Sequence, residues 1–258
     1  MKLDQLAGNV NLTYCTNIHA GESWPDIRAS LDAHVPAIKA AVAPDRPLGI
    51  GLRLSGEAAA VARQPEQLAA FREQLAGLGA YVFTINAFPF GPFHGVRVKE
   101  HVYLPDWRSA ERVAFTADSA AVLAAVLPDG VDGSISTVPG AFKANGRADG
   151  AVAAIAASMM KAVADLVMTE RRTGKRIALA LEPEPCCFSP RHSTFSRPAS
   201  VKIAMAPSSC CAAISVSATI SATDPSNTKI PSRRWTGCWP PASRCRRSSS
   251  PPRCAFPP

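Results

Sequence analysis

Polar or charged side chains stand at the ends of five apolar segments of this sequence. The residues at these positions are Asn17, His19, Arg53, Asn86, Thr137, Glu182 and Glu184. Imidazole and carboxylate groups can move protons, whereas amide and hydroxyl groups can bind substrate hydroxyls. The recurrence is more specific than any one of its members, and it indicates a site that binds or transforms a small polar molecule.

Two of these residues, His19 and Glu184, are candidates for acid–base catalysis. A histidine titrates near neutral pH, and a carboxylate held in a site can accept and return a proton. The alternative for His19 is a hydrogen-bonded histidine at the rim of the site. The alternative for Glu184, which follows Pro183, is a surface carboxylate or one that supports a neighbouring ligand.

Four other residues, Asn17, Arg53, Asn86 and Thr137, are candidates for substrate binding. A guanidinium at the end of an apolar segment is costly to bury alone, so Arg53 requires either an acidic partner or an anionic substrate. Amide and hydroxyl groups can orient substrate hydroxyls. For Asn86 and Thr137, hydrogen bonding to the backbone at the end of a strand is the alternative role.

A long irregular segment over residues 89–107, PFGPFHGVRVKEHVYLPDW, carries further candidates. Loops of this length inside compact domains are often functional. His94 and Lys99, together with Arg97, are candidates to bind a phosphate or carboxylate group of a substrate. A solvated basic loop is the alternative.

The segments that must position these residues alternate between strand and helix patterns. Apolar runs rich in β-branched and aromatic residues predict five strands, over residues 9–19, 48–55, 80–88, 131–140 and 176–183. Helical patterns lie between them, and Pro36 is expected to kink or break the first helix. Strands that are apolar throughout are typical of parallel sheets covered on both faces.

Two α/β architectures fit this alternation, a (β/α)8 barrel and a doubly wound sheet. Neither GxGxxG nor GxxxxGK[ST] follows the first strand, which weakens the nucleotide-binding form of the doubly wound sheet. In a barrel, the polar side chains at the carboxyl ends of the strands would share one site.

The composition of the chain changes near Phe188. Residues 189–258 contain 10 of the 28 Lys and Arg residues, one of the 20 Asp and Glu residues and 11 of the 23 prolines. The formal charge of +8 therefore arises in this segment. A sequence rich in Pro, Ser and Arg buries too little apolar surface to offset its chain entropy. We therefore expect a folded domain over residues 1–188 and a disordered basic tail over residues 189–258.

A shift of reading frame accounts for this change. Back-translated and read from the third base of each codon, residues 211–231 are compatible with RRHIGVCYDICHRSVEYEDP, and residues 246–258 with KVQLSSALRLP. Both peptides have strand patterns, and the segment between them is compatible with a helix. We infer a frameshift near Phe188 that removes the last three strands of the fold from the encoded protein.

Five long segments before this break can be compared with a known family: YCTNIHAGESW, GIGLRLS, FTINAFPFGPFHGVRVKEHVYLPDWR, GSISTVPGAFK and LALEPEPCCF. They resemble the metabolite traffic protein EboE family, which is similar to the xylose isomerase-like TIM barrels that include sugar phosphate isomerases and epimerases. The resemblance covers nearly all of residues 10–188. It implies a (β/α)8 TIM barrel that is incomplete in this chain, with about five βα units.

The resemblance also implies a divalent metal, Mn, Mg or Zn, held by carboxylates and a histidine at the ends of strands five to eight. Such a metal polarises a hydroxy-carbonyl substrate while acid–base groups move a proton. Glu182 stands at the strand-five ligand position, although a rim or helix-capping carboxylate is the alternative. Because the strand-six ligands fall in the shifted-frame CYDICH, we expect this chain not to bind the metal tightly.

Two functions follow from the resemblance. The first is a metal-dependent isomerase or epimerase, truncated here, that acts on a sugar- or polyol-like metabolite. The second is a non-catalytic protein that binds or carries such a metabolite on the same barrel. Turnover with added metal separates the two, and other proteins of a metabolite-traffic cluster are further expected partners.

Other classes are disfavoured by the sequence. The basic tail has no recognised nucleic-acid motif and few interleaved aromatic residues, and no uninterrupted apolar run is long enough to cross a bilayer. The cysteines lack paired CxxC spacing, and the first residues lack a signal-peptide pattern, so we expect a cytoplasmic protein with free thiols. Because five open strands leave two unpaired edges, we expect a marginally stable product.

Overall fold

The computed structural model describes residues 1–3, 10–94, 99–182, 187–188, 201–203 and 214–218. The chain divides into two compact units, Met1–Ile220 and Ser221–Pro258, and all described residues lie in the first. Five strands of this unit form a parallel sheet: β1 (Thr13–Cys15), β2 (Leu48–Arg53), β3 (Ala80–Asn86), β4 (Gly133–Thr137) and β6 (Ile177–Leu181). Their order in the sheet is their order in the sequence.

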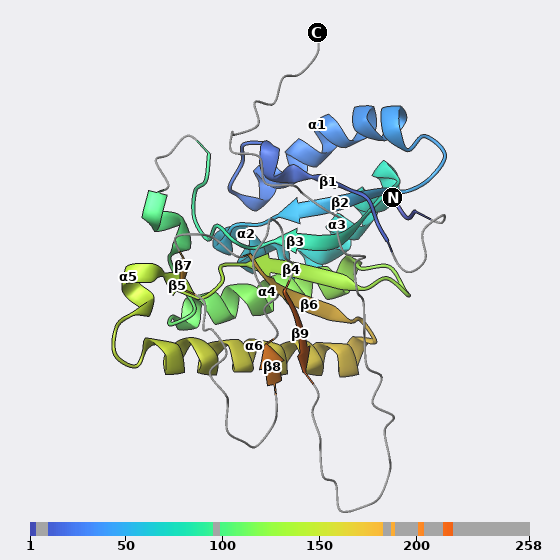
Figure 1. Cartoon of the computed structure of the whole chain (residues 1–258). Coiled ribbons are helices and arrows are strands. Elements are labelled where there is room, and N and C mark those ends of the chain that lie inside the picture. The colour runs from blue at the N-terminus through green and yellow to red at the C-terminus, as the bar shows by residue number, and fades with distance from the viewer. Residues whose placement is uncertain (4–9, 95–98, 183–186, 189–200, 204–213, 219–258) are drawn as a thin grey trace, which may run out of the picture. The chain divides into compact units, whose positions relative to one another are not determined.

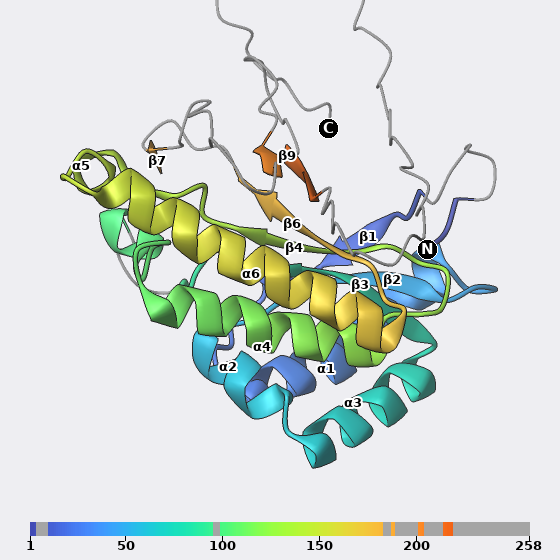
Figure 2. The ribbon, with the colours of Figure 1, turned by 90° about the horizontal axis from the view of Figure 1, so that it is seen from below.

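Helices connect these strands: α1 (Trp24–Val42), α2 (Gly56–Ala62), α3 (Pro65–Leu78), α4 (Ala110–Val126) and α6 (Ala151–Thr173). Figure 1 shows the sheet and the helices that run beside it. In Figure 2 all five helices lie on the same side of the sheet. The core lies between these two layers, where Ile50, Val82, Ile135 and Leu179 are buried.

The helices begin and end where the local sequence predicts. Ser23 caps α1 in a capping box with Asp26, and Pro65 occupies the first turn of α3. Gly79 ends α3 and Gly174 ends α6, both with positive φ. The helical segment between β2 and β3 is divided at Pro65 into two separate helices, α2 and α3.

The expected break at Pro36 is wrong, because α1 runs without interruption from Trp24 to Val42. Pro36 lies on the exposed side of the helix, whereas Ile27, Leu31 and Val35 are buried. The hydrogen bond that proline cannot donate is lost at a solvated position, and the burial of the apolar stripe keeps the helix intact.

The first predicted strand is shorter than expected. Residues 9–19 contribute only β1, and a 3-10 helix, η1 (Thr16–Ile18), follows it directly. The hydroxyl of Thr16 donates to the carbonyl of Gly51 at 3.3 Å and accepts from the backbone N–H of Arg53 at 3.0 Å. These bonds turn the chain away from the sheet immediately after β1.

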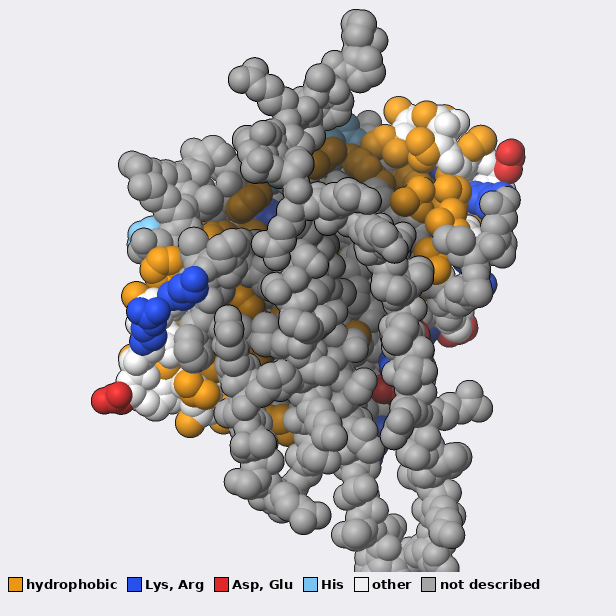
Figure 3. Space-filling model, in the orientation of Figure 1, with side chains coloured by type: hydrophobic (Ala, Val, Ile, Leu, Met, Phe, Trp, Pro, Cys, Tyr) orange, Lys and Arg blue, Asp and Glu red, His pale blue; other side chains and the backbone are white. Residues whose placement is uncertain are grey.

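The two edges of the parallel sheet differ. Among the described strands β1 pairs with β2 alone, and Leu12 and Ile18 near it are 53% and 68% exposed. Figure 3 shows hydrophobic side chains gathered over α1, next to this edge. At the other edge β9 (Ile214–Ala218) pairs antiparallel with β6, and β8 (Val201–Ile203) pairs antiparallel with β9. These two strands belong to the predicted tail, and their direction differs from that of a sixth barrel strand.

Shorter elements complete the described part: β5 (Ala141–Phe142), α5 (Lys143–Gly146), β7 (Cys187–Phe188), which pairs antiparallel with β5, and η2 (Lys99–Tyr103). By length and composition alone, α6 is long and apolar enough to cross a membrane. This differs from the prediction that the sequence contains no apolar run of that length. A core helix passes the same test, and α6 buries Ile155, Met159 and Leu166 in the protein. The helix is therefore weak evidence for a membrane span.

Candidate functional site

A pocket of about 300 Å³ lies at the carboxyl ends of the parallel strands. The described residues that line it are Asn17, Arg53, Asn86, Phe88, Pro89, Phe93, Val102, Tyr103 and Glu182. Four of the residues predicted from the sequence, Asn17, Arg53, Asn86 and Glu182, therefore meet in one place. They do so because parallel strands that follow one another in the sheet bring their carboxyl ends to the same edge.

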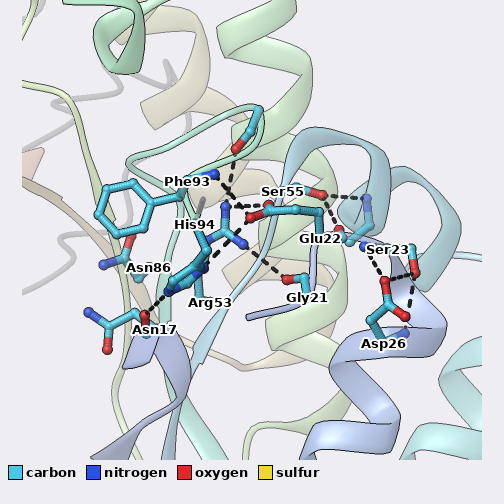
Figure 4. A network of polar contacts seen from close by, with 12 residues as sticks. Asn17, Gly21, Glu22, Ser23, Asp26, Arg53, Ser55, Asn86, Phe93 and His94 are labelled. Atoms are coloured by element: carbon cyan, nitrogen blue, oxygen red, sulfur yellow. Dashed lines mark hydrogen bonds and ion pairs between the residues drawn. The ribbon is translucent and has the colours of Figure 1, made fainter. Parts of the chain in front are cut away.

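Arg53, the last residue of β2, is the most constrained charged group of the pocket, with 3% of its side chain exposed. Its Nη2 atom lies 2.6 Å from Oε2 of Glu22 and donates to the carbonyl of Gly91 at 3.1 Å. Its Nη1 atom donates to the carbonyl of Gly21 at 3.2 Å. Figure 4 shows how Glu22 and the loop carbonyls surround the guanidinium. Of the two partners expected for Arg53, the structure thus contains the acidic one.

Glu22 was not identified from the sequence, although an acidic partner was one of the two possibilities expected for Arg53. Its Oε1 atom accepts from the backbone N–H of Phe93 at 3.0 Å, so one carboxylate holds both Arg53 and the loop after β3. Burial tends to raise the pKa of Glu22, but the hydrogen bonds from Arg53 and Phe93 and the charge of Arg53 outweigh it and lower the pKa. Glu22 is therefore ionised at neutral pH, and it compensates the charge of Arg53.

The guanidinium of Arg53 also lies beside an aromatic ring. Its Cζ atom is 5.9 Å from the centroid of the Phe93 ring, within reach of a cation–π interaction. Among the described atoms, Nε of Arg53 is buried and has no hydrogen-bond partner. Both terminal nitrogens of the guanidinium contact Glu22 or carbonyl groups, so the side chain is held in one orientation.

His94 lies beside this network. Its Nε2 atom is 2.9 Å from the carbonyl oxygen of Asn17, and its Nδ1 atom is 3.8 Å from Oε1 of Glu22. His94 is not among the residues that line the pocket. Its contacts tie the loop after β3 to the turn after β1, and the predicted binding of an anionic group by His94 stays a prediction.

The two asparagines that line the pocket use different groups in their described hydrogen bonds. Oδ1 of Asn86 accepts from the backbone N–H of Phe88 at 3.1 Å, which starts the turn after β3. The side-chain nitrogen of Asn86 carries two further donors. For Asn17 the hydrogen bond to His94 uses the backbone carbonyl, so the side chain can be changed without removing that contact.

Arg112 on α4 positions the loop that forms one wall of the pocket. The side chain is fully buried, and it donates to the carbonyls of Pro105 at 2.7 Å, Ala87 at 2.7 Å and Phe88 at 3.1 Å. Burial lowers the pKa of Arg112 to about 10, an effect that nearby Asp106 opposes, so the group stays charged at neutral pH. A buried arginine that joins both ends of residues 87–105 fixes the path of this loop.

His19 lies outside the pocket. Its ring stacks on His34 of α1 with the centroids 3.9 Å apart, and its Nε2 atom contacts the hydroxyl of Tyr14. Burial, followed by the charges of His34 and His94, lowers the pKa of His19. These contacts match the alternative of a hydrogen-bonded histidine at the rim.

Three further predicted residues do not add side chains to the described pocket. Thr137 is buried at the end of β4, and its carbonyl accepts from the backbone N–H of Glu182 at 2.9 Å. Lys99 belongs to η2, but its side chain is outside the described part of the structure. Glu184 lies outside the described residues altogether.

The described donors do not fit the metal site that the resemblance implies. Within these residues no group of three or more His, Cys, Asp or Glu side chains could hold a metal ion. Glu182 is the one acidic residue among the described residues that line the pocket. The neighbouring Glu22 is bound to Arg53 and Phe93, and one carboxylate falls short of the three or more protein ligands usual for such a site.

Comparisons with protein-family models, with curated proteins and with solved structures found no match to this chain. The interpretation of the pocket therefore depends on its geometry. Besides Glu22 and Arg112, the sequence did not single out Phe93 and Tyr103, which reach the pocket from the loop. The length of that loop and the charge of Arg53 were the only signals for them.

Proposed function

We propose that this chain supplies five βα units of a (β/α)8 barrel whose pocket binds a neutral polyhydroxy metabolite. The strand order supports the barrel, because the five parallel strands lie in sequence order. In a doubly wound sheet the order of the strands reverses at a switch point. The connecting helices lie on one side of the sheet, whereas a doubly wound sheet has helices on both sides. The resemblance to the EboE family, which has the same expected fold, is part of this proposal.

The observation that carries the choice of ligand is the ion pair between Arg53 and Glu22. The one cationic side chain of the described lining is already neutralised at 2.6 Å, and Glu182 adds a carboxylate to the same pocket. A phosphate or carboxylate group on the ligand would find no unpaired cation among the described residues of the lining. A ligand with hydroxyl groups in place of a charge does not require one.

The other lining residues match such a ligand. The amides of Asn17 and Asn86 both donate and accept, as hydroxyl groups do. Phe88, Phe93 and Tyr103 offer apolar surface for the carbon skeleton of a small molecule. A volume of about 300 Å³ lies at the lower end of the range for ligand pockets, which is about 300–1,000 Å³. The pocket therefore suits a pentose, a hexose or a cyclitol.

For the encoded chain we propose binding without turnover. Glu182 lines the pocket at the end of β6, and this position favours a second candidate, a metal-dependent isomerase or epimerase in the frame-restored barrel. The two candidates separate when pentoses and hexoses are assayed with the 258-residue chain and with the product of the restored frame. Turnover by the restored protein alone is the expected result, and turnover by the 258-residue chain would contradict binding without chemistry.

The binding proposal is tested with Asn17→Ala, which removes a lining amide but keeps the backbone carbonyl that His94 contacts. Saturation-transfer NMR with a panel of neutral pentoses, hexoses and cyclitols should identify a ligand of the wild-type chain. Its affinity should fall about tenfold in the variant, the value of one good hydrogen bond.

Asn145→Ala in α5 is the matched control, because it makes the same substitution outside the pocket. The control should bind the ligand as the wild type does. If no neutral polyol binds, or if both variants bind equally well, the proposal is wrong.

A further inference from the structure

A groove lies between α4 and α6, the two helices that Figure 2 shows side by side. Its volume is about 290 Å³. Apart from Arg63, which ends α2, its described lining comes from α4 and α6. None of these residues lines the pocket at the carboxyl ends of the strands, so the groove is a separate feature of the molecule.

The lining of the groove is mainly apolar. Ala121, Ala162 and Leu166 contribute small or buried apolar side chains. The hydroxyls of Thr116 and Thr169 also line it, but each donates to the carbonyl four residues earlier in its own helix at 2.9 Å. Because these hydroxyls are already paired, an apolar side chain can cover them without leaving a polar group unsatisfied.

Met168 on α6 lines the same groove and is unusually exposed. The exposed fraction of this residue is 59%, although its neighbours Leu166 and Thr169 are buried. Methionine is a long and flexible apolar side chain that adapts to irregular apolar surfaces. Each copy of the chain thus carries an apolar side chain that protrudes beside an apolar hollow. Two identical surfaces that fit each other in this way are what a two-fold symmetric interface requires.

The charges of the groove are arranged symmetrically about Met168. Asp165 and Arg172 lie on the same face of α6, about two turns apart, with Met168 between them. Neither side chain forms an ion pair with another described residue. On the other side of the groove Arg63 and Asp118 neutralise each other at 3.0 Å.

This arrangement of charges selects the kind of partner. The described lining carries two cationic and two acidic side chains, so it does not favour a nucleic acid or an anionic lipid surface. A second copy whose α6 runs in the opposite direction presents the same charges in reverse order. Each unpaired charge on α6 then faces one of opposite sign, which favours association of two copies.

We propose that two copies of this chain associate through this groove, with their α6 helices antiparallel. A two-fold axis that passes between Met168 and Thr169 places Asp165 opposite Arg172 of the partner subunit, and the same pair forms a second time by symmetry. Met168 of each copy lies against the groove of the other. This interface is independent of the pocket at the carboxyl ends and of its proposed function.

Sedimentation velocity of the purified 258-residue chain, over a range of protein concentrations, tests the proposal. A reversible species with twice the mass of one chain is expected. Met168→Glu introduces a charge into the interface twice, once from each copy, and should raise the dissociation constant of the dimer about a hundredfold or more. The control is Val42→Glu, which makes the same change at a residue of α1 that is 54% exposed, and it should not alter the dissociation constant.

Charge reversal tests the antiparallel register. Asp165→Arg makes both positions on α6 positive, and Arg172→Asp makes both negative. Each variant alone should be monomeric, because like charges then face each other across the two-fold axis. An equimolar mixture of the two variants should form a dimer, since every contact again joins opposite charges. Circular dichroism on each variant should show the helix content of the wild type, and a role of these residues within one chain would not restore association in the mixture.

The proposal is overturned by any of three results. The first is a monomer at every concentration of the wild-type chain, whether or not that chain binds vesicles of anionic phospholipid. The second is a dimer whose dissociation constant is the same in the wild type and in Met168→Glu. The third is a mixture of the two charge-reversal variants that stays monomeric. Asn17→Ala should form a dimer as the wild type does, which keeps this test separate from that of the proposed function.

Discussion

The two ends of the parallel sheet are built from different chemistry. At the carboxyl ends, Arg53, Glu22 and Asn86 hold loops in place through an ion pair and hydrogen bonds to backbone groups. At the amino ends, glycine, alanine and proline let the turns pack closely, and a cavity between them is mainly apolar. The polar end is specified by a few paired groups, whereas the apolar end depends on the absence of side-chain volume.

This difference predicts how a substitution at each end will affect the stability of the protein. Removing one member of a buried polar network leaves its partners unsatisfied, which is costly. Adding a methyl group to a tight backbone contact forces the chain to move. The predictions below test whether the two ends fail in these two different ways.

The largest effect is expected for Arg112→Met, because Arg112 holds the loop at the carboxyl end of the sheet. The substitution keeps much of the side-chain volume but leaves the carbonyls of Pro105, Ala87 and Phe88 without their donor. We expect a loss of about 3–5 kcal/mol in the free energy of unfolding, measured by urea denaturation. Arg72→Met, at an exposed arginine with one carbonyl contact, should cost no more than about 0.5 kcal/mol. Equal stability of the two variants would contradict the role of Arg112.

A smaller effect is expected at the amino end for Gly49→Ala. A Cβ atom at Gly49 would lie 2.6 Å from the carbonyl oxygen of Leu12, closer than such atoms approach. We expect a loss of about 1–3 kcal/mol from this overpacking. Gly77→Ala is the control, because a Cβ atom there meets nothing within 4 Å, and it should stabilise α3 by up to about 1 kcal/mol. A neutral Gly49→Ala would show that the amino end is more loosely packed than described.

The smallest effect concerns His19 at the rim of the carboxyl end. Because its pKa in the folded protein lies below the ordinary value of 6.5, the stability that neutral His19 contributes is present above pH 6.5 and is lost as the pH falls through the lowered pKa. NMR titration of the His19 ring should show that His34→Ala raises this pKa, since it removes a neighbouring charge. His101→Ala should leave the pKa of His19 unchanged. The same pKa in the wild type, His34→Ala and His101→Ala would contradict an effect of His34 on His19.

The sequence predicted the positions at the ends of the strands better than the residues that reach them through loops. Arg53, Asn86 and Glu182 line the pocket because they end a parallel strand or directly follow one, and Asn17 lines it from the 3-10 helix after β1. Glu22 and Phe93 could not be placed in this way, since their positions depend on loop conformations that have no periodic pattern. The position of His19 was not predictable either, because it follows a 3-10 helix after β1 and does not line the pocket.

The alternation of strands and helices was also predictable, but the continuity of α1 through Pro36 was not. A local signal for a break was outweighed by the burial of Ile27, Leu31 and Val35, which depends on tertiary packing. The closure of the sheet into a barrel stays a prediction. Residues beyond β6 would decide it. On the side of β6 away from β4, the described strand β9 pairs antiparallel.

The central claim is that Glu22 neutralises Arg53 and so makes the pocket selective for uncharged polyols. The direct test is the ratio of dissociation constants for the best neutral polyol and its monophosphate, measured by calorimetry on the wild type, on Glu22→Gln and on the control Glu66→Gln. The wild type and the control should prefer the neutral ligand, and Glu22→Gln should shift the ratio toward the phosphate by about tenfold or more. A wild-type protein that prefers the phosphate, or a ratio that does not change in Glu22→Gln, would contradict the account.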